Sequence, residues 1–166
     1  MEIIHWGSKI EKIIPGHGIL GGVLCFTHDG GYCLFDGGYK YALDINEENI
    51  INRKSLDYYF KARSKREKIF NKSIKNISRA LNVDKNQAYS LLLGFQDVYE
   101  IDSGDLGDLG EASWFCQGEA GRCGCAMGYD AVKDFDEQGS MYLVDCVGKE
   151  IVKEKKEGAL LERELA

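Results

Sequence analysis

The chain has 166 residues, of which 44% are hydrophobic and 11% aromatic, so it is long and apolar enough to form one folded domain. Its net charge of −6 argues against non-specific nucleic-acid binding, and no apolar run approaches the roughly 18 residues of a membrane-spanning helix. The N-terminus enters an apolar run without a basic start, so we expect no signal peptide. The six cysteines lack the spacing of a disulfide scaffold, which favours a reduced, cytoplasmic protein.

The first block of the chain, up to about residue 51, is typical of strands and turns. Residues 2–6 form a short apolar run, and residues 22–27 have the composition of a buried strand. Residues 39–45 alternate between apolar and polar side chains, which predicts a half-buried strand.

The middle block changes to helical periodicity. Ser64 and Glu67 have the spacing of a capping box, and apolar residues follow at helical intervals up to Leu81. Asp84 can cap a second helix that ends at Gly94. A third helix is predicted to begin near Glu111.

Strands return in the last block. Residues 136–139 have the composition of a turn, and residues 140–147 form the clearest strand pattern in the chain. The order of strands, helices and strands predicts an α+β domain over residues 1–148, with a helical insertion at about 52–127. Residues 149–166 are predicted to be a charged C-terminal tail.

The cysteines do not predict a metal site. Cys116, Cys123 and Cys125 could bind zinc together with His5 or His28, but this chain has no C-x-x-C pair. A C-x6-C-x-C spacing is not usual for zinc ligands.

The charges are segregated along the chain. Residues 61–85 contain nine basic residues against two acidic ones, whereas residues 86–121 contain seven acidic residues and no basic one. One interpretation is a pair of solvated helix faces of opposite sign, and the other is a surface patterned for a charged macromolecular partner.

Several short motifs together resemble a known enzyme superfamily. In chain order they are Met1–His5, Leu24–Phe26, Asp44–Ile51, Glu111–Trp114 and the turn Asp136-Glu137-Gln138-Gly139, followed by Tyr142 and Asp145. This series resembles the ADP-ribosyltransferase superfamily. It is most similar to the anti-CRISPR ADP-ribosyltransferases that inactivate type I-F CRISPR surveillance complexes, and the resemblance runs from Met1 to about Gly148.

The resemblance implies a split antiparallel β-sheet core and NAD as the substrate. His5 would hold the adenosine-side ribose, and Phe26 or Tyr32 would pack on the nicotinamide. Glu137 would be the catalytic carboxylate that stabilises the positive charge of an oxocarbenium-like transition state, with Asp136 beside it. The resemblance also places three further residues in the NAD-binding set: Trp6, Thr27 and Trp114.

One position departs from the anti-CRISPR pattern, because Phe115 stands where those proteins have an acidic residue after the Ser-Trp pair. Glu111 or Glu119 could substitute from one helical turn away. The implied function is modification of a protein subunit of a CRISPR surveillance complex in the host bacterial cytoplasm, which blocks target DNA recognition. The alternatives are a non-catalytic protein-binding inhibitor on the same fold and a toxin-type ADP-ribosyltransferase with another host target. Neither a direct nucleic-acid partner nor a membrane is expected.

Overall fold

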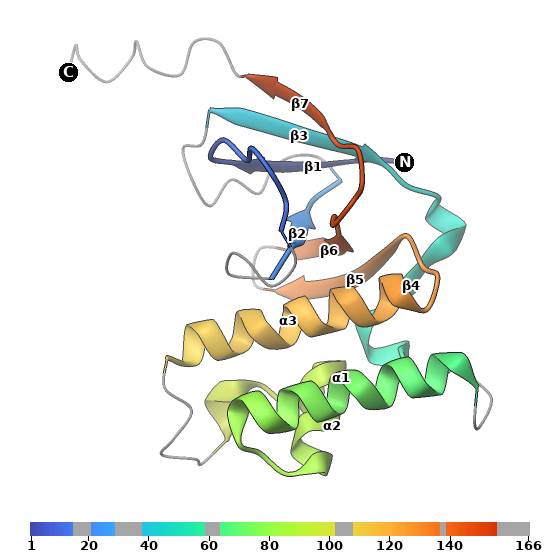
Figure 1. Ribbon diagram of the computed structural model, residues 1–166, viewed down its shortest axis with the longest axis vertical. Coiled ribbons are helices and arrows are strands. Elements are labelled where there is room, and N and C mark those ends of the chain that lie inside the picture. The colour runs from blue at the N-terminus through green and yellow to red at the C-terminus, as the bar shows by residue number, and fades with distance from the viewer. Residues whose placement is uncertain (15–20, 29–37, 59–63, 102–107, 137–138, 156–166) are drawn as a thin grey trace.

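The computed structural model describes residues 1–14, 21–28, 38–58, 64–101, 108–136 and 139–155. They form three layers, in which a four-stranded sheet lies between a three-stranded sheet and a layer of helices (Figure 1). The predicted α+β class is confirmed. In this part of the chain, no helix is long and apolar enough to cross a membrane.

The two sheets use strands from both ends of the chain. The three-stranded sheet is antiparallel and has the order β1 (Glu2–Gly7), β3 (Tyr39–Asp44), β7 (Val152–Lys155). The four-stranded sheet has the order β2 (Val23–Phe26), β6 (Gly139–Asp145), β5 (Ala131–Asp136), β4 (Ile50–Asn52), and only its β4–β5 pair is parallel.

A single antiparallel bridge joins the sheets in the described residues. Ile4 on β1 and Thr27, the residue after β2, exchange two backbone hydrogen bonds, each 2.8 Å long. Because β1 and β2 belong to different sheets, the side chains beside this bridge lie at the junction between the two sheets.

The helices follow the predicted signals. They are α1 (Lys65–Leu81), α2 (Lys85–Leu93) and α3 (Leu109–Ala126), with the short 3-10 helices η1 (Glu47–Asn49), η2 (Arg53–Ser55) and η3 (Val98–Glu100). Ser64 caps α1 by accepting a hydrogen bond from the Glu67 amide, and Asp84 caps α2 within a capping box. Gly94 ends α2 in the left-handed conformation, with a φ of 67°.

Helix α3 is longer than its glycine content suggests, because its glycines face the sheet. A Cβ at Gly124 would lie 2.2 Å from Cγ2 of Val132, and a Cβ at Gly121 would lie 2.8 Å from Cγ1 of Val23. Side chains at these positions would hold the helix away from β2 and β5. The glycines therefore allow α3 to pack closely on the four-stranded sheet.

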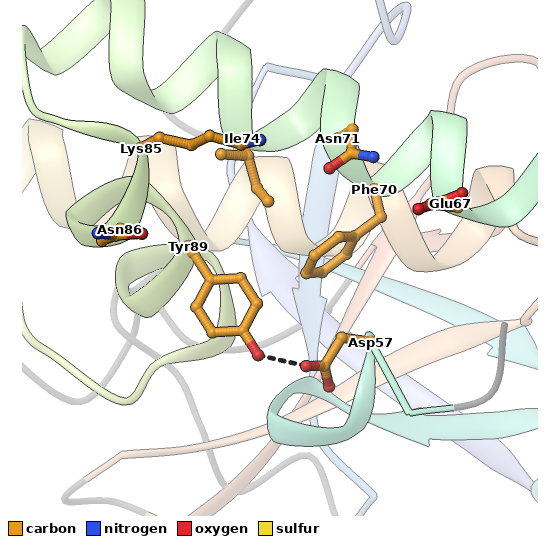
Figure 2. Close-up of a pocket in the computed structure, with 8 residues that line it drawn as sticks. All are labelled: Asp57, Glu67, Phe70, Asn71, Ile74, Lys85, Asn86 and Tyr89. Carbon is orange, nitrogen blue, oxygen red and sulfur yellow. Dashed lines mark hydrogen bonds between the residues drawn. The ribbon is translucent and has the colours of Figure 1, made fainter. Parts of the chain in front are cut away.

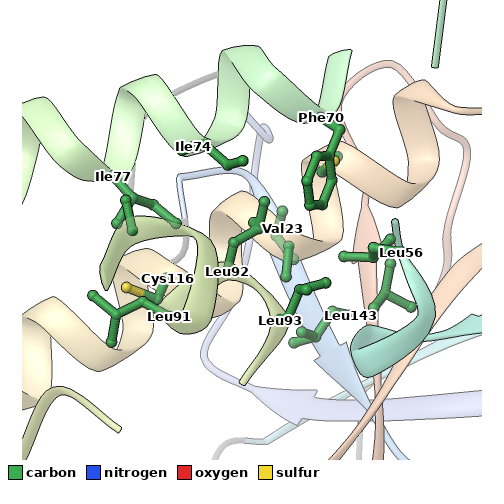
Figure 3. Close-up of a cluster of buried hydrophobic side chains, with 14 of the residues drawn as sticks. Val23, Leu56, Phe70, Ile74, Ile77, Leu91, Leu92, Leu93, Cys116 and Leu143 are labelled. Atoms are coloured by element: carbon green, nitrogen blue, oxygen red, sulfur yellow. The ribbon is translucent and has the colours of Figure 1, made fainter. Parts of the chain in front are cut away.

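The core has two parts. The larger one lies between the helices and the four-stranded sheet, and Figure 3 shows side chains from α1, α2, α3 and the sheet meeting there. The smaller one lies between the two sheets and includes Ile3, Phe26 and Tyr142.

The C-terminal segment differs from the prediction of a charged tail. Residues 152–155 form β7, which pairs with β3 in the register Ala42↔Val152 and Tyr39↔Lys155. Strand β7 lies at a sheet edge, and its Val152 side chain is 62% exposed. An exposed edge strand does not require the alternation of apolar and polar residues that marks a half-buried strand. The charged sequence of residues 152–155 therefore did not indicate a strand.

Candidate functional site

His5 lies on β1 beside the junction of the two sheets. Its Nδ1 atom is 2.7 Å from the carbonyl oxygen of Cys25 on β2. A carbonyl oxygen only accepts hydrogen bonds, so we assign the proton to Nδ1, which leaves Nε2 as an acceptor. Burial lowers the pKa of His5 below 6.5, although the hydrogen bond to Cys25 opposes the shift, and the imidazole is therefore neutral at pH 7.

The imidazole ring is enclosed by aromatic neighbours and by the backbone of β1. Its centroid is 5.8 Å from the centroid of the Phe26 ring and 5.9 Å from that of the Tyr41 ring. Tyr41 lies on β3 and is the cross-strand partner of His5. A Cβ at Gly7 would lie 2.9 Å from Nε2. Glycine at this position therefore leaves room for the ring.

Phe26 and Thr27 have different environments. Phe26 is fully buried within the core between the sheets, so the prediction that its ring packs on nicotinamide is wrong for this conformation. This burial agrees with the buried-strand composition of residues 22–27, because β6 and the facing sheet cover the ring. Thr27 is also buried, and its Oγ1 has no hydrogen-bond partner in the described chain. An unpaired buried hydroxyl is unfavourable, and a ligand can satisfy such a group.

The two predicted tryptophans do not join His5. Trp6 follows His5 on β1, and because successive side chains of a strand alternate, it lies on the other face of the three-stranded sheet. Trp114 lies on α3 and is 40% exposed, and α3 packs on the side of the four-stranded sheet away from the three-stranded sheet (Figure 1). The structure therefore does not gather these residues into one NAD-binding set with His5.

Asp136 ends β5 and pairs with Gly139 on β6. Burial raises the pKa of the Cys25 thiol to about 12, and the negative charges of Asp136 and then Asp134 add to the shift. The Asp136 carboxylate therefore acts electrostatically on the thiol of Cys25, the residue whose carbonyl group holds His5. The predicted residues Glu137 and Tyr32 lie outside the described residues.

Glu119 has a structural role instead of the predicted catalytic substitution. It is buried, and its Oε1 accepts hydrogen bonds of 3.1 Å and 2.8 Å from Nε and Nη2 of Arg122. Its Oε2 accepts one of 3.1 Å from Asn76. Arg122 also donates to the carbonyl oxygen of Gly21, just before β2. Glu111, the other candidate, is exposed in the first turn of α3.

The described cysteines are free thiols and show no metal-binding geometry. Burial is the main cause that raises their pKa values, and the values for Cys116, Cys123 and Cys146 are about 12. Within the described ranges, no group of three His, Cys, Asp or Glu residues is placed to hold a metal ion.

A separate polar cavity of about 330 Å³ lies between α1, α2 and the turn after η2. Figure 2 shows Tyr89 of α2 donating a hydrogen bond to Asp57 of that turn, with Phe70 and Glu67 on α1 nearby. This bond is the main cause that raises the pKa of Tyr89 to about 12. The phenol therefore stays protonated at neutral pH, and the pair fastens α2 to the turn. Sequence reasoning missed it because its residues come from three separate segments.

Comparison with known proteins supports the fold only. No family model matches the chain, and no curated protein matches it. Among solved structures, it is similar to one described as a crystal structure of an anti-CRISPR protein, with a TM-score of 0.54 and 20% identity. The match covers 93% of this chain and 94% of that one, so the two proteins share a fold over nearly their whole length.

Proposed function

We propose that this chain is an anti-CRISPR protein that acts as an NAD-dependent mono-ADP-ribosyltransferase. Its target would be a protein subunit of a CRISPR surveillance complex in the host bacterial cytoplasm, and the modification would block recognition of target DNA. The fold shared with an anti-CRISPR protein supports the first part of the proposal. The sequence motifs around His5 and Glu137 support the enzymatic part.

The observation that carries the proposal is the neutral His5 at the junction of the two sheets. Its Nε2 is an unprotonated acceptor that has no hydrogen-bond donor in the described part of the chain. A ribose hydroxyl can donate to such an atom. Thr27 Oγ1, which also lacks a partner there, is a second polar group that a ribose could satisfy. These two residues fit the adenosine side of NAD.

The proposed reaction breaks the bond between nicotinamide and ribose. Nicotinamide leaves, and an acceptor atom of the target protein forms a new bond to the same ribose carbon and loses a proton. Positive charge develops on the ribose between these events. A carboxylate at Glu137 would stabilise this charge, as an electrostatic group aimed at a transition state does.

The test uses radiolabelled NAD and a purified type I-F surveillance complex. We expect the wild-type chain to transfer label to one protein subunit, and Glu137→Ala to transfer none. Glu150→Ala is the matched control, because Glu150 is an exposed acid outside the site. Labelling by both wild type and Glu137→Ala would refute the proposed catalytic role of Glu137.

A non-catalytic inhibitor is the second candidate, favoured by the surface of α1. Five exposed cations recur at intervals of three and four residues and so form one stripe along the helix: Lys65, Lys68, Lys72, Lys75 and Arg79. None of them forms an ion pair within the described chain. Such a stripe suits docking on an acidic protein surface.

The same labelling experiment separates the candidates. Stable binding to the complex without label would favour the inhibitor. Label on another protein of a host lysate, with none on the complex, would favour a toxin-type transferase.

A further inference from the structure

A second cavity, whose wall includes the Tyr41 side chain that packs on His5, has the features of an anion-binding site. It measures about 910 Å³ and lies between residues 9–13 and residues 146–153, with Tyr41 also in its wall. This volume is within the range of about 300–1,000 Å³ that is usual for small-molecule sites. Its lining includes four lysines and one acidic residue: Lys9, Lys12, Lys149, Lys153 and Glu11. The lining is therefore basic in a chain whose net charge is −6.

This cavity lies away from the predicted catalytic turn that follows β5. Cys146, in its lining, follows the C-terminal end of β6, whereas Asp136 and Gly139 lie at the other end of that strand. A seven-residue strand at about 3.3 Å per residue is roughly 20 Å long. The predicted catalytic turn and the basic cavity therefore lie at opposite ends of β6.

The wall of the cavity is held in place by hydrogen bonds. Lys153 Nζ donates to the carbonyl oxygen of Ile10 over 3.2 Å, and the Ile10 amide donates to the Tyr41 hydroxyl over 2.6 Å. That hydroxyl in turn donates to the Ser8 carbonyl oxygen over 2.9 Å. A site that is formed before binding loses less entropy when a ligand arrives.

Two of the four lysines remain available for a ligand. Lys9 pairs with Glu11 at 2.6 Å, and Lys153 is bonded to the wall. Lys12 and Lys149 are exposed and form no hydrogen bond or ion pair through their side chains within the described chain. Half-buried isoleucines complete the lining: Ile10, Ile13 and Ile151. The cavity thus offers two ammonium groups beside an apolar surface.

We propose that this cavity binds an organic phosphate of nucleotide size. Lys12 and Lys149 would contact the phosphates, because ammonium groups form strong charge-assisted hydrogen bonds with phosphate oxygens. The isoleucines would contact the apolar body of the ligand. Such a site goes beyond the proposed transferase activity and could regulate it.

Calorimetric titration with ADP tests the proposal. We expect saturable binding to the wild type, weaker binding of inorganic pyrophosphate and little binding of adenosine. Combined Lys12→Glu and Lys149→Glu should raise the Kd for ADP about tenfold or more, because each phosphate contact to an ammonium group is lost. Combined Lys72→Glu and Lys75→Glu on α1 makes the same change in net charge and should leave the Kd within a factor of about two, since surface charges far from a site are screened.

His5→Ala keeps this test independent of the proposed NAD site. ADP is part of NAD, so it could bind there instead, and His5→Ala would then weaken ADP binding. Loss of binding in the Lys12 and Lys149 variant, with binding retained in His5→Ala, supports the proposal. The proposal is overturned if ADP fails to bind the wild type, if the lysine variant binds normally, or if His5→Ala abolishes binding.

Discussion

Replacing Gly124 with alanine should destabilise the protein, although alanine is the better helix former. Gly124 lies on α3 where the helix meets the four-stranded sheet, and a Cβ there would lie 2.2 Å from Cγ2 of Val132. Leu56 and Ile51 side chains also lie at 3.4 Å and 3.5 Å from that Cβ. Val132 is fully buried, so it has little free space into which it can move.

Two opposing effects set the magnitude. Alanine favours a helix over glycine by about 1 kcal/mol. Overpacking of a core costs about 1–3 kcal/mol, and a contact this short belongs at the upper end. The free energy of unfolding should therefore fall by about 1–2 kcal/mol.

Urea unfolding followed by circular dichroism measures this change, and Val132→Ala provides the control. In the double variant, the new methyl group at 124 takes part of the space that the valine left. The two changes together should then cost at least about 0.5 kcal/mol less than the sum of the single changes. A neutral or stabilising Gly124→Ala, or strictly additive effects, would refute close helix–sheet packing as the reason for this glycine.

Four further predictions concern the proposed activity and the residues placed behind it. Glu137→Gln should lower turnover by about 10²–10³ with unchanged thermal stability, because it removes one electrostatic group from the reaction; equal turnover would contradict this. His5→Ala should weaken NAD affinity in calorimetry more than it lowers turnover, since the proposed contact is to an unreactive part of NAD. The lowered pKa of His5 also predicts that wild-type stability falls as the pH drops below 6.5, because the unfolded chain then binds a proton that the folded chain does not, whereas His5→Asn should lose this dependence. Reversal of Lys65, Lys68 and Lys72 to Glu should slow modification of the intact target without changing hydrolysis of free NAD, and high salt should reduce the difference.

Local signals in the sequence predicted most of the secondary structure. The caps at Ser64 and Asp84 and the stop at Gly94 are each made by one or two residues, so sequence alone identifies them. The strand predicted at residues 22–27 corresponds to β2, because a continuous apolar run is also a local signal. Strand β7 was missed because hydrogen bonds to β3 form it, and no local pattern encodes a partner so distant in sequence.

The candidate site was harder to predict, because the burial of a side chain and the direction in which it points depend on how the sheets and helices pack together. Phe26 lies in a predicted buried strand, and only the family resemblance placed its ring on a nicotinamide, whereas the structure encloses it fully. Glu119 lies one helical turn from Phe115, where it could replace the acidic residue missing at that position. Its carboxylate instead accepts hydrogen bonds from Arg122 and Asn76. The lysines of the basic cavity come from two segments more than 130 positions apart, such as Lys9 and Lys149, and each alone is an ordinary surface residue.

The helical layer also helps to position His5, although it lies on the other side of the four-stranded sheet. Arg122 on α3 donates a 3.1 Å hydrogen bond to the carbonyl oxygen of Gly21, two residues before β2 begins. Gly121 allows the same helix to pack against Val23, the first residue of β2. Because the Cys25 carbonyl group on β2 holds the imidazole, the placement of His5 depends on contacts made by α3.

Changes at Arg122 should therefore affect NAD affinity as well as stability. Arg122→Met leaves the buried Glu119 carboxylate without its counter-ion and should cost about 3 kcal/mol at most, since the Arg122 side chain is 27% exposed. Adding Glu119→Gln removes that buried charge and should restore much of the free energy of unfolding measured in urea. It does not restore the bond to Gly21, so the double variant should still bind NAD more weakly than the wild type in calorimetry. Wild-type affinity in a double variant of recovered stability would show that β2 holds His5 in place without help from α3.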